Sequence, residues 1–203
     1  TTAAVVAEGA TLTLDGGVDV TIGSTADAST TITVTAGNNM AVNGAIGSVD
    51  GDDVVLTADT GSITTTATIE ADNEVTLIAG QNIVTGATVT ADGDDVNLTA
   101  VTGSITTGAD VLASVNALLT AGQDITAGGA VTATTGEVNL NGGNDVTTTG
   151  FALTATAGPV NVTAGEDAVL DTIIAGNGAA TIDAGIDMVL GGDVTAALGD
   201  ITG

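Results

Sequence analysis

Aspartates at a regular spacing are the residues of this chain whose type and position could do chemistry. A short turn of the form A-G-x-[ND], followed by an apolar residue, recurs along the sequence. Its last position is occupied in order by Asn39, Asn82, Asp124, Asp145, Asp167 and Asp187. If the turns stack, the four aspartates stand about 4.8 Å apart and repel by roughly 0.9 kcal/mol per pair in water. Such a ladder must be well solvated or bridged by divalent cations, and oxygen ligands alone favour Ca²⁺.

A second acidic set occurs at another turn. In chain order it contains Asp52, Asp53, Glu74, Asp94, Asp95 and Glu137. Aspartate also forms turns without any metal, because it bonds its own backbone and tolerates left-handed geometry. The Ca²⁺-loop pattern GGxGxDxφx does not occur as a repeat. Two interpretations therefore stay open: structural turns with loosely held counterions, or Ca²⁺ sites. The candidate ligands are Asp52, Asp53, Asp94, Asp95, Asp124, Asp145, Asp167 and Asp187.

The composition limits the partners. The chain has 203 residues, 25 Asp and Glu, no Lys, Arg or His, and a formal net charge of −25. Because nothing can neutralise phosphate groups, binding to nucleic acid or to an anionic membrane surface is excluded. No apolar run reaches the roughly 18 residues that span a bilayer. The expected partners are copies of the chain itself and divalent cations.

Catalysis would have to use carboxylates and hydroxyls alone, because His, Lys, Arg, Cys and Tyr are all absent. Two carboxylates suffice for a glycosidase. Such sites also need aromatic or basic residues to hold sugars, and the sole aromatic residue is Phe151. We predict that the protein is not an enzyme and has no cofactor, with Ca²⁺ as the one ion to consider.

A hydrophobic period of about 21 residues indicates the elements that must position these turns. One apolar column has a constant spacing of 21 from Val54 to Val138, and Leu12, Ile32, Val160 and Ile182 continue it with small slips. A second column lies two residues further on, at Leu14, Val34, Leu56, Leu77, Leu98, Leu119, Leu140 and Val162. A fixed period in this range is typical of a solenoid, in which no repeat buries its apolar face alone.

Each repeat divides into three short alternating segments separated by Gly, Asn and Asp turns. In the repeat VTLIAGQNIVTGATVTADGDD the segments start near Val75, Ile83 and Ala87. The alternation and the β-branched residues predict strands, and helix signals are absent. The sequence therefore predicts an all-β fold: a single-stranded parallel β-helix (β-solenoid) of about 21 residues per coil and nine to ten coils, forming one domain over residues 1–203.

Several single residues carry further expectations. Phe151 falls in the column of Ala87, Ala109 and Gly129 and is expected to point inward. Pro159 is expected at a corner of a coil, where no ladder donor is needed. Sequons begin at Asn97 and Asn161.

Outward threonine columns are also expected, on the first strand at Thr35, Thr57, Thr99, Thr120 and Thr163 and on the second at Thr64, Thr106, Thr126 and Thr147. Flat threonine arrays suggest ice binding, but the neighbouring column, which contains Val55, Asn97 and Leu118, is mixed. Threonine also favours exposed strands in any β protein. Ice binding therefore stays a minor alternative.

The segments GDDVNLTAVTGSITTGADVLA and ALLTAGQDITAGGAVTATTGEVNLNGG resemble the haemagglutinin-type repeats of filamentous-haemagglutinin-like bacterial exoproteins. The resemblance covers residues 30–190 and rests on alternating φ-x-L-x-A followed by A-G-x-D-φ. It implies secretion, a long right-handed β-helical shaft, and a role in adhesion or surface structure. The chain departs from that family in lacking Lys and Arg and any secretion-domain motif.

Both ends of the sequence read as solenoid, without a helix or a charged cap. Open strand edges predict head-to-tail stacking between copies. The absence of an initiating Met and of a signal peptide predicts a processed or excised segment. We expect a structural subunit of an extracellular filament, sheath or surface layer, located outside the cell or on its surface. The alternative is the passive shaft of a secreted adhesin.

Overall fold

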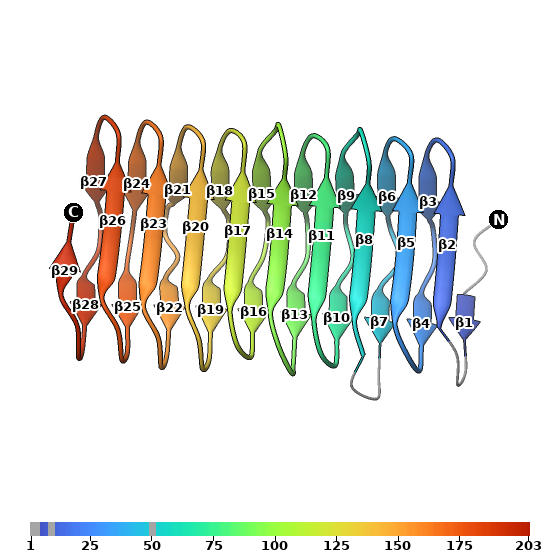
Figure 1. The fold of residues 1–203 in the computed structure, drawn as a ribbon, viewed down its shortest axis with the longest axis horizontal. Helices are drawn as coiled ribbons and strands as arrows, with labels where there is room; N and C mark the ends of the chain where they lie inside the picture. Colours follow the sequence, from blue (N-terminus) through green and yellow to red (C-terminus); the bar gives the residue numbers. More distant parts are fainter. Residues whose placement is uncertain (1–4, 8–10, 49–51) are drawn as a thin grey trace.

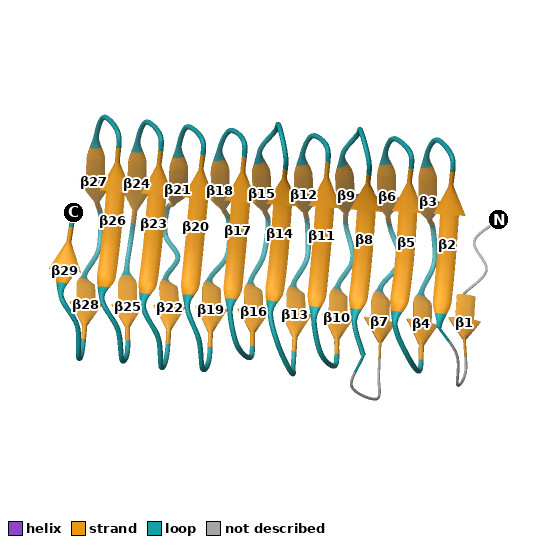
Figure 2. Ribbon diagram, viewed as in Figure 1, coloured by secondary structure: helices purple, strands orange, loops and turns teal. Residues whose placement is uncertain are grey.

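Three parallel β-sheets form the walls of a single solenoid in the computed structural model (Figure 1). The structure describes residues 5–7, 11–48 and 52–203. Residues 1–4, on which the expectation of an uncapped N-terminal end depends, lie outside this range. Over the described residues the chain makes 29 strands and no helix (Figure 2). None of those residues forms a helix long and apolar enough to cross a bilayer.

Sheet B has the longest strands, because five alternating residues separate its two turns. Its strands are β2 (Leu12–Gly16), β5 (Ile32–Ala36), β8 (Val54–Ala58), β11 (Val75–Ala79), β14 (Val96–Ala100), β17 (Ala117–Ala121), β20 (Val138–Gly142), β23 (Val160–Ala164), β26 (Ala180–Ala184) and β29 (Ile201–Thr202).

Sheets C and A follow sheet B in each coil and consist of three-residue strands. Sheet C contains β3 (Val20–Ile22), β6 (Met40–Val42), β9 (Ile63–Thr65), β12 (Ile83–Thr85), β15 (Ile105–Thr107), β18 (Ile125–Ala127), β21 (Val146–Thr148), β24 (Ala168–Leu170) and β27 (Met188–Leu190). Sheet A contains β1 (Val5–Ala7), β4 (Ala26–Ala28), β7 (Ile46–Ser48), β10 (Ile69–Ala71), β13 (Val89–Ala91), β16 (Val111–Ala113), β19 (Val131–Ala133), β22 (Leu153–Ala155), β25 (Ile173–Ala175) and β28 (Val194–Ala196).

The register confirms the predicted parallel β-helix and its period. Val75 pairs with Val54 on one side and with Val96 on the other, each 21 residues away. One assignment was wrong: Val160 pairs with Ala180, and Ile182 pairs with Val162 in the second column. The coil from Val160 is 20 residues long, and a shift of two residues leaves the inward face unchanged. Alternation alone therefore could not reveal the slip.

The core is a narrow prism filled by the inward side chains of all three sheets. Leu77, Ile83 and Val89, one from each sheet, are fully buried. The strands of sheet A end at Ala or Ser, and those of sheet B, except for β29, end at Ala or Gly. Backbone hydrogen bonds between coils continue through the corners, as from the Val75 N–H to the Asp95 carbonyl at 3.0 Å. Few backbone groups are left unpaired in such a stack. The core includes one polar column: Thr65, Thr85 and Thr107 are buried, and their hydroxyls have no hydrogen-bond partner.

Phe151 does not point inward, contrary to the expectation from its column. Its side chain is 41% exposed in the turn between β21 and β22. That turn has four residues (149–152), one more than the equivalent turn at residues 128–130. The extra residue is accommodated by Gly150, whose φ of 83° is a left-handed conformation that suits glycine. The resulting bulge directs the ring to solvent.

Pro159 directly precedes β23 at a corner, as predicted.

The last coil exposes side chains that are buried in the coils before it. Ala168 and Leu170 on β24 are buried, whereas Met188 and Leu190, their partners on β27, are 37% and 43% exposed. Ile201 on β29 is 55% exposed. An edge strand without a neighbour also leaves part of its backbone groups unpaired.

Candidate functional site

The predicted aspartate ladder lies at the corner between sheets B and C, here called the B–C corner ladder. It is formed by the residue that directly precedes each strand of sheet C. In order these residues are Asp19, Asn39, Ser62, Asn82, Ser104, Asp124, Asp145, Asp167 and Asp187. The four consecutive aspartates are therefore stacked one per coil, as the sequence indicated.

A continuous run of hydrogen bonds joins the members of the ladder. In each link the backbone N–H of one residue donates to the side-chain oxygen of the equivalent residue in the preceding coil. The donor–acceptor distances from Asn39 to Asp187 are 2.9, 3.1, 3.2, 2.9, 3.2, 3.4, 3.1 and 3.1 Å. All links run in the same direction along the stack. The side chains thus satisfy backbone donors at a corner, in the way that caps satisfy the ends of helices.

Three members of this ladder were missed in the sequence: Asp19, Ser62 and Ser104. The two serines were missed because the motif was restricted to Asn and Asp, although a serine hydroxyl accepts the same bond. The position of the two serines within the repeat could have identified them as members of the ladder. Ser62 and Ser104 each directly precede an inward isoleucine, just as Asp124 precedes Ile125.

The second acidic set lies at the corner between sheets A and B, here called the A–B corner. There the Asn116 N–H donates to Asp95 Oδ1 at 2.8 Å, and the Glu137 N–H donates to Asn116 Oδ1 at 2.9 Å. Asp53 Oδ1 accepts from the side-chain Nδ2 of Asn73 at 2.7 Å. This corner uses the same type of link as the first, but less regularly.

The surroundings of Asp94 favour the protonated form of its side chain. Desolvation by its neighbours raises the pKa of Asp94 above its ordinary value of 3.8. The negative charges of Asp95, Glu74 and Asp53 raise the pKa further, because they disfavour a fourth charge at this corner.

The structure divides the eight calcium candidates between two corners. Four belong to the B–C corner ladder and the other four to the A–B corner, at Asp52, Asp53, Asp94 and Asp95. Within residues 5–7, 11–48 and 52–203, no three acidic side chains form a group that could hold a metal ion. Calcium prefers six to eight oxygen ligands. The role that the hydrogen bonds give these residues is structural, and Ca²⁺ binding stays a prediction.

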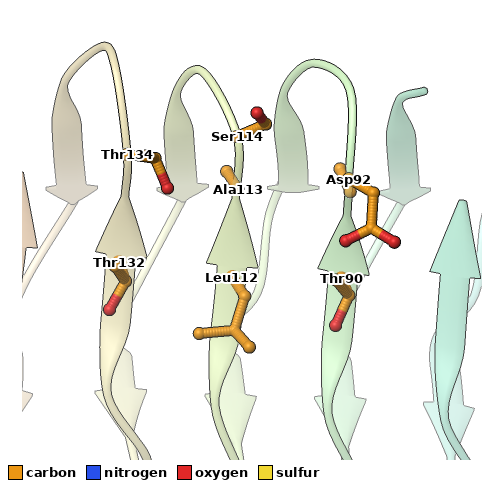
Figure 3. A pocket seen from close by; sticks show the side chains of 8 residues that line it. Thr90, Asp92, Leu112, Ala113, Ser114, Thr132 and Thr134 are labelled. Atoms are coloured by element: carbon orange, nitrogen blue, oxygen red, sulfur yellow. The ribbon is translucent and has the colours of Figure 1, made fainter. Parts of the chain in front are cut away.

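The outer surface of the described residues includes two open depressions. The first, of about 280 Å³, lies over sheet A (Figure 3). Its lining comprises Thr90, Ala91, Asp92, Leu112, Ala113, Ser114, Thr132 and Thr134. The second, of about 310 Å³, is lined by Gln81, Asn82, Thr102, Gly103 and Gln123. One carboxylate lines the first and none lines the second.

The outward threonine columns lie where the sequence placed them, and they are interrupted. On sheet B, Ile78 separates Thr57 from Thr99. On sheet C, Val84 separates Thr64 from Thr106. Sheet B thus presents no unbroken lattice of threonine hydroxyls.

No family model, no curated protein and no solved structure matches this chain. The resemblance to haemagglutinin-type repeats therefore stays a hypothesis that rests on the quoted segments.

Proposed function

We propose that the protein is a structural subunit of an extracellular filament, sheath or surface layer, and that copies assemble by stacking end to end. The observation that carries this proposal is the exposed core of the last coil, at Met188, Leu190 and Ile201. Fully burying an exposed side chain of this size contributes about 1.5–3 kcal/mol, and because these three are 37%, 43% and 55% exposed, covering the remainder of each contributes roughly half of that. A contact that covers this end therefore has a substantial driving force.

The order of the strands supports a second copy as the cover. Sheet A begins with β1 and ends with β28, and sheet B begins with β2 and ends with β29. If β1 and β2 of one copy paired with β28 and β29 of the next, both sheets would continue in parallel across the junction. Such a contact is heterologous and does not close, so it propagates as a filament.

Charge sets the condition for assembly. Each copy carries a formal net charge of −25, which opposes the approach of a second copy. Screening by salt shortens this repulsion, and divalent cations would reduce it further. Assembly should therefore depend on ionic conditions.

The test is electron microscopy of the purified chain in EDTA and in millimolar Ca²⁺. Filaments with an axial repeat close to the length of one stack, on the order of 45 Å, would support end-to-end assembly. A requirement for Ca²⁺ that equal ionic strength of NaCl does not replace would support a specific role for the aspartates. Short monodisperse rods under both conditions would rule out the filament.

There are two alternatives to a filament subunit. In the passive shaft of a secreted adhesin, further coils of a longer chain would cover it, as the resemblance to exoprotein repeats suggests. In an ice-binding solenoid, a flat outer face would be the active surface, and the interrupted threonine columns speak against it. We do not propose catalysis, because the chain has no His, Lys, Arg, Cys or Tyr and would have to rely on carboxylates and hydroxyls alone. An extracellular location agrees with the absence of Lys and Arg, which leaves no cleavage site for trypsin-like proteases.

A further inference from the structure

Three asparagines in this chain are followed directly by glycine. They are Asn43, Asn141 and Asn177. All three side chains are exposed, so exposure does not distinguish them. In an Asn-Gly pair the glycine nitrogen is unusually accessible, because no Cβ stands beside it. The three pairs differ in how the backbone holds that nitrogen.

Two of the glycines are held by backbone pairing. Gly142 is the last residue of β20 and pairs with Ala121 on one side and Ala164 on the other. The Gly44 N–H donates to the Ile22 carbonyl at 3.3 Å. In both places the nitrogen can react only after the local backbone opens, and opening costs free energy.

The third glycine is not held in this way. Gly178 lies in the turn between β25 and β26, and among the described residues its N–H donates to no acceptor. The Asn177 carboxamide beside it likewise has no hydrogen bond to another described residue, whereas the Asn43 carboxamide accepts one from Thr66 at 3.4 Å. The nucleophilic nitrogen and the carboxamide at this turn are therefore both without a hydrogen-bond partner among the described residues.

We propose that Asn177 is a site of spontaneous deamidation. The Gly178 backbone nitrogen loses its proton and bonds to Cγ of Asn177, while the Cγ–Nδ2 bond breaks and ammonia leaves. The product is a five-membered succinimide. Water then opens the ring, at Cγ to give aspartate or at the backbone carbonyl carbon to give isoaspartate. The net change is the addition of one water and the loss of one ammonia, without an oxidant or a reductant.

The packing around the turn gives this reaction a structural consequence. A Cβ on Gly178 would lie 2.5 Å from the Pro159 nitrogen, and one on Gly199 would lie 2.4 Å from the Gly178 carbonyl carbon. The backbone of this turn is thus enclosed between two neighbouring coils. Isoaspartate adds a methylene to the main chain, so β26 must shift to accommodate it.

The test follows the three sites in the intact folded chain during incubation at mildly alkaline pH. Aliquots are digested with a glutamate- or aspartate-specific protease, and mass spectrometry with fragmentation measures aspartate and isoaspartate at each site. We expect Asn177 to react at least about tenfold faster than Asn141, since each 1.4 kcal/mol of opening free energy slows the reaction about tenfold. Asn43 should also be slower than Asn177.

The same incubation in denaturant supplies the control. There the three sites should react at similar rates, because no backbone pairing remains. Equal rates at Asn177 and Asn141 in the folded chain would overturn the proposal, and so would an Asn177 that reacts only after unfolding. Asn177→Ser should remove the fast release of ammonia without altering the circular dichroism spectrum. These readouts are independent of filament assembly.

Discussion

Asp145 illustrates what single residues contribute to this fold. Its Oδ1 accepts from the Asp167 N–H at 3.1 Å, while its own N–H donates to Asp124 at 3.4 Å. Asp145 therefore accepts one hydrogen bond of the B–C corner ladder and donates another. A carboxylate at this position has a structural reason to be present, whether or not a cation is bound.

Two substitutions of Asp145 distinguish the effect of its hydrogen-bond acceptor from the effect of its negative charge. Asp145→Ala leaves the Asp167 N–H without its acceptor, and we expect a loss of about 1–2 kcal/mol in the free energy of unfolding. Asp145→Asn keeps an acceptor and removes one of four stacked charges, so its stability in EDTA should equal or exceed that of the wild type. Thermal unfolding followed by circular dichroism measures both, with Asp59→Ala, an exposed turn residue, as the control. A large loss of stability in Asp145→Asn without Ca²⁺ would contradict this account.

Asp94 should make stability depend on pH in an unusual direction. Its pKa in the folded state is raised above the ordinary value of 3.8, so the folded state binds the proton more readily than the unfolded state. The contribution of Asp94 to stability therefore increases as the pH falls through the raised pKa, and it is complete below the ordinary value.

The measurement compares melting temperatures from pH 7 downward in the wild type and in Asp94→Asn. The variant should be more stable at pH 7, and the difference between the two proteins should shrink as the pH falls. Asp92→Asn changes an exposed carboxylate two residues away and serves as the control. A constant difference across this range would show that Asp94 does not titrate with a raised pKa.

Single elements show how far the sequence determines the structure. The period of 21 predicted the strands and the register of most coils, because inward apolar positions recur without interruption from Val54 to Val138. Prediction failed where the coil length changes. The extra residue before Leu153 turned Phe151 outward, and the short coil after Val160 moved Ile182 to the other column. Turn lengths leave no mark on strand alternation, so the sequence alone could not place these two side chains.

The candidate site was predictable to a similar extent. Spacing predicted that the aspartates stack, and the structure adds the chain of backbone donors that they satisfy. The serines at equivalent positions were overlooked because their side chains suggest a metal site less readily. Whether Ca²⁺ binds depends on the free energies of hydration and coordination, which residue spacing does not report.

The turns that join the strands depend on close contact between coils. A Cβ on Gly165 would lie 2.0 Å from the Gly143 carbonyl oxygen, whereas one on Gly17 would meet nothing within 4 Å. We expect Gly165→Ala to destabilise the fold by about 1–3 kcal/mol through overpacking and Gly17→Ala to have little effect. Urea unfolding of both variants measures the difference. Similar midpoints for the two would contradict the close stacking at this corner.

At the scale of the whole molecule, the proposed end-to-end assembly rests on the exposed side chains of the last coil. Leu190 on β27 is 43% exposed, so a charge there should be tolerated in the single subunit. Within an end-to-end contact the same charge would be buried without a partner, at a cost of several kcal/mol. We expect Leu190→Asp to remain as single rods under conditions in which the wild type forms filaments.

Sedimentation velocity and electron microscopy measure this outcome. Thr126→Asp adds the same charge to an exposed outward position in the middle of sheet C and should still assemble. Equal assembly of both variants would show that the last coil is not the contact surface. Loss of assembly in both would assign the effect to net charge.

The direction of the hydrogen bonds also governs how this rod responds to a pulling force. The bonds between strands run parallel to the long axis, so tension applied to the two chain ends loads them one coil at a time. One folded coil occupies about 4.8 Å of the long axis, and the same residues span roughly 70 Å once the coil has detached and its chain is extended. The rod should therefore lengthen many-fold in small successive steps at nearly constant force, dissipating work as it unwinds and rewinding when the load is removed.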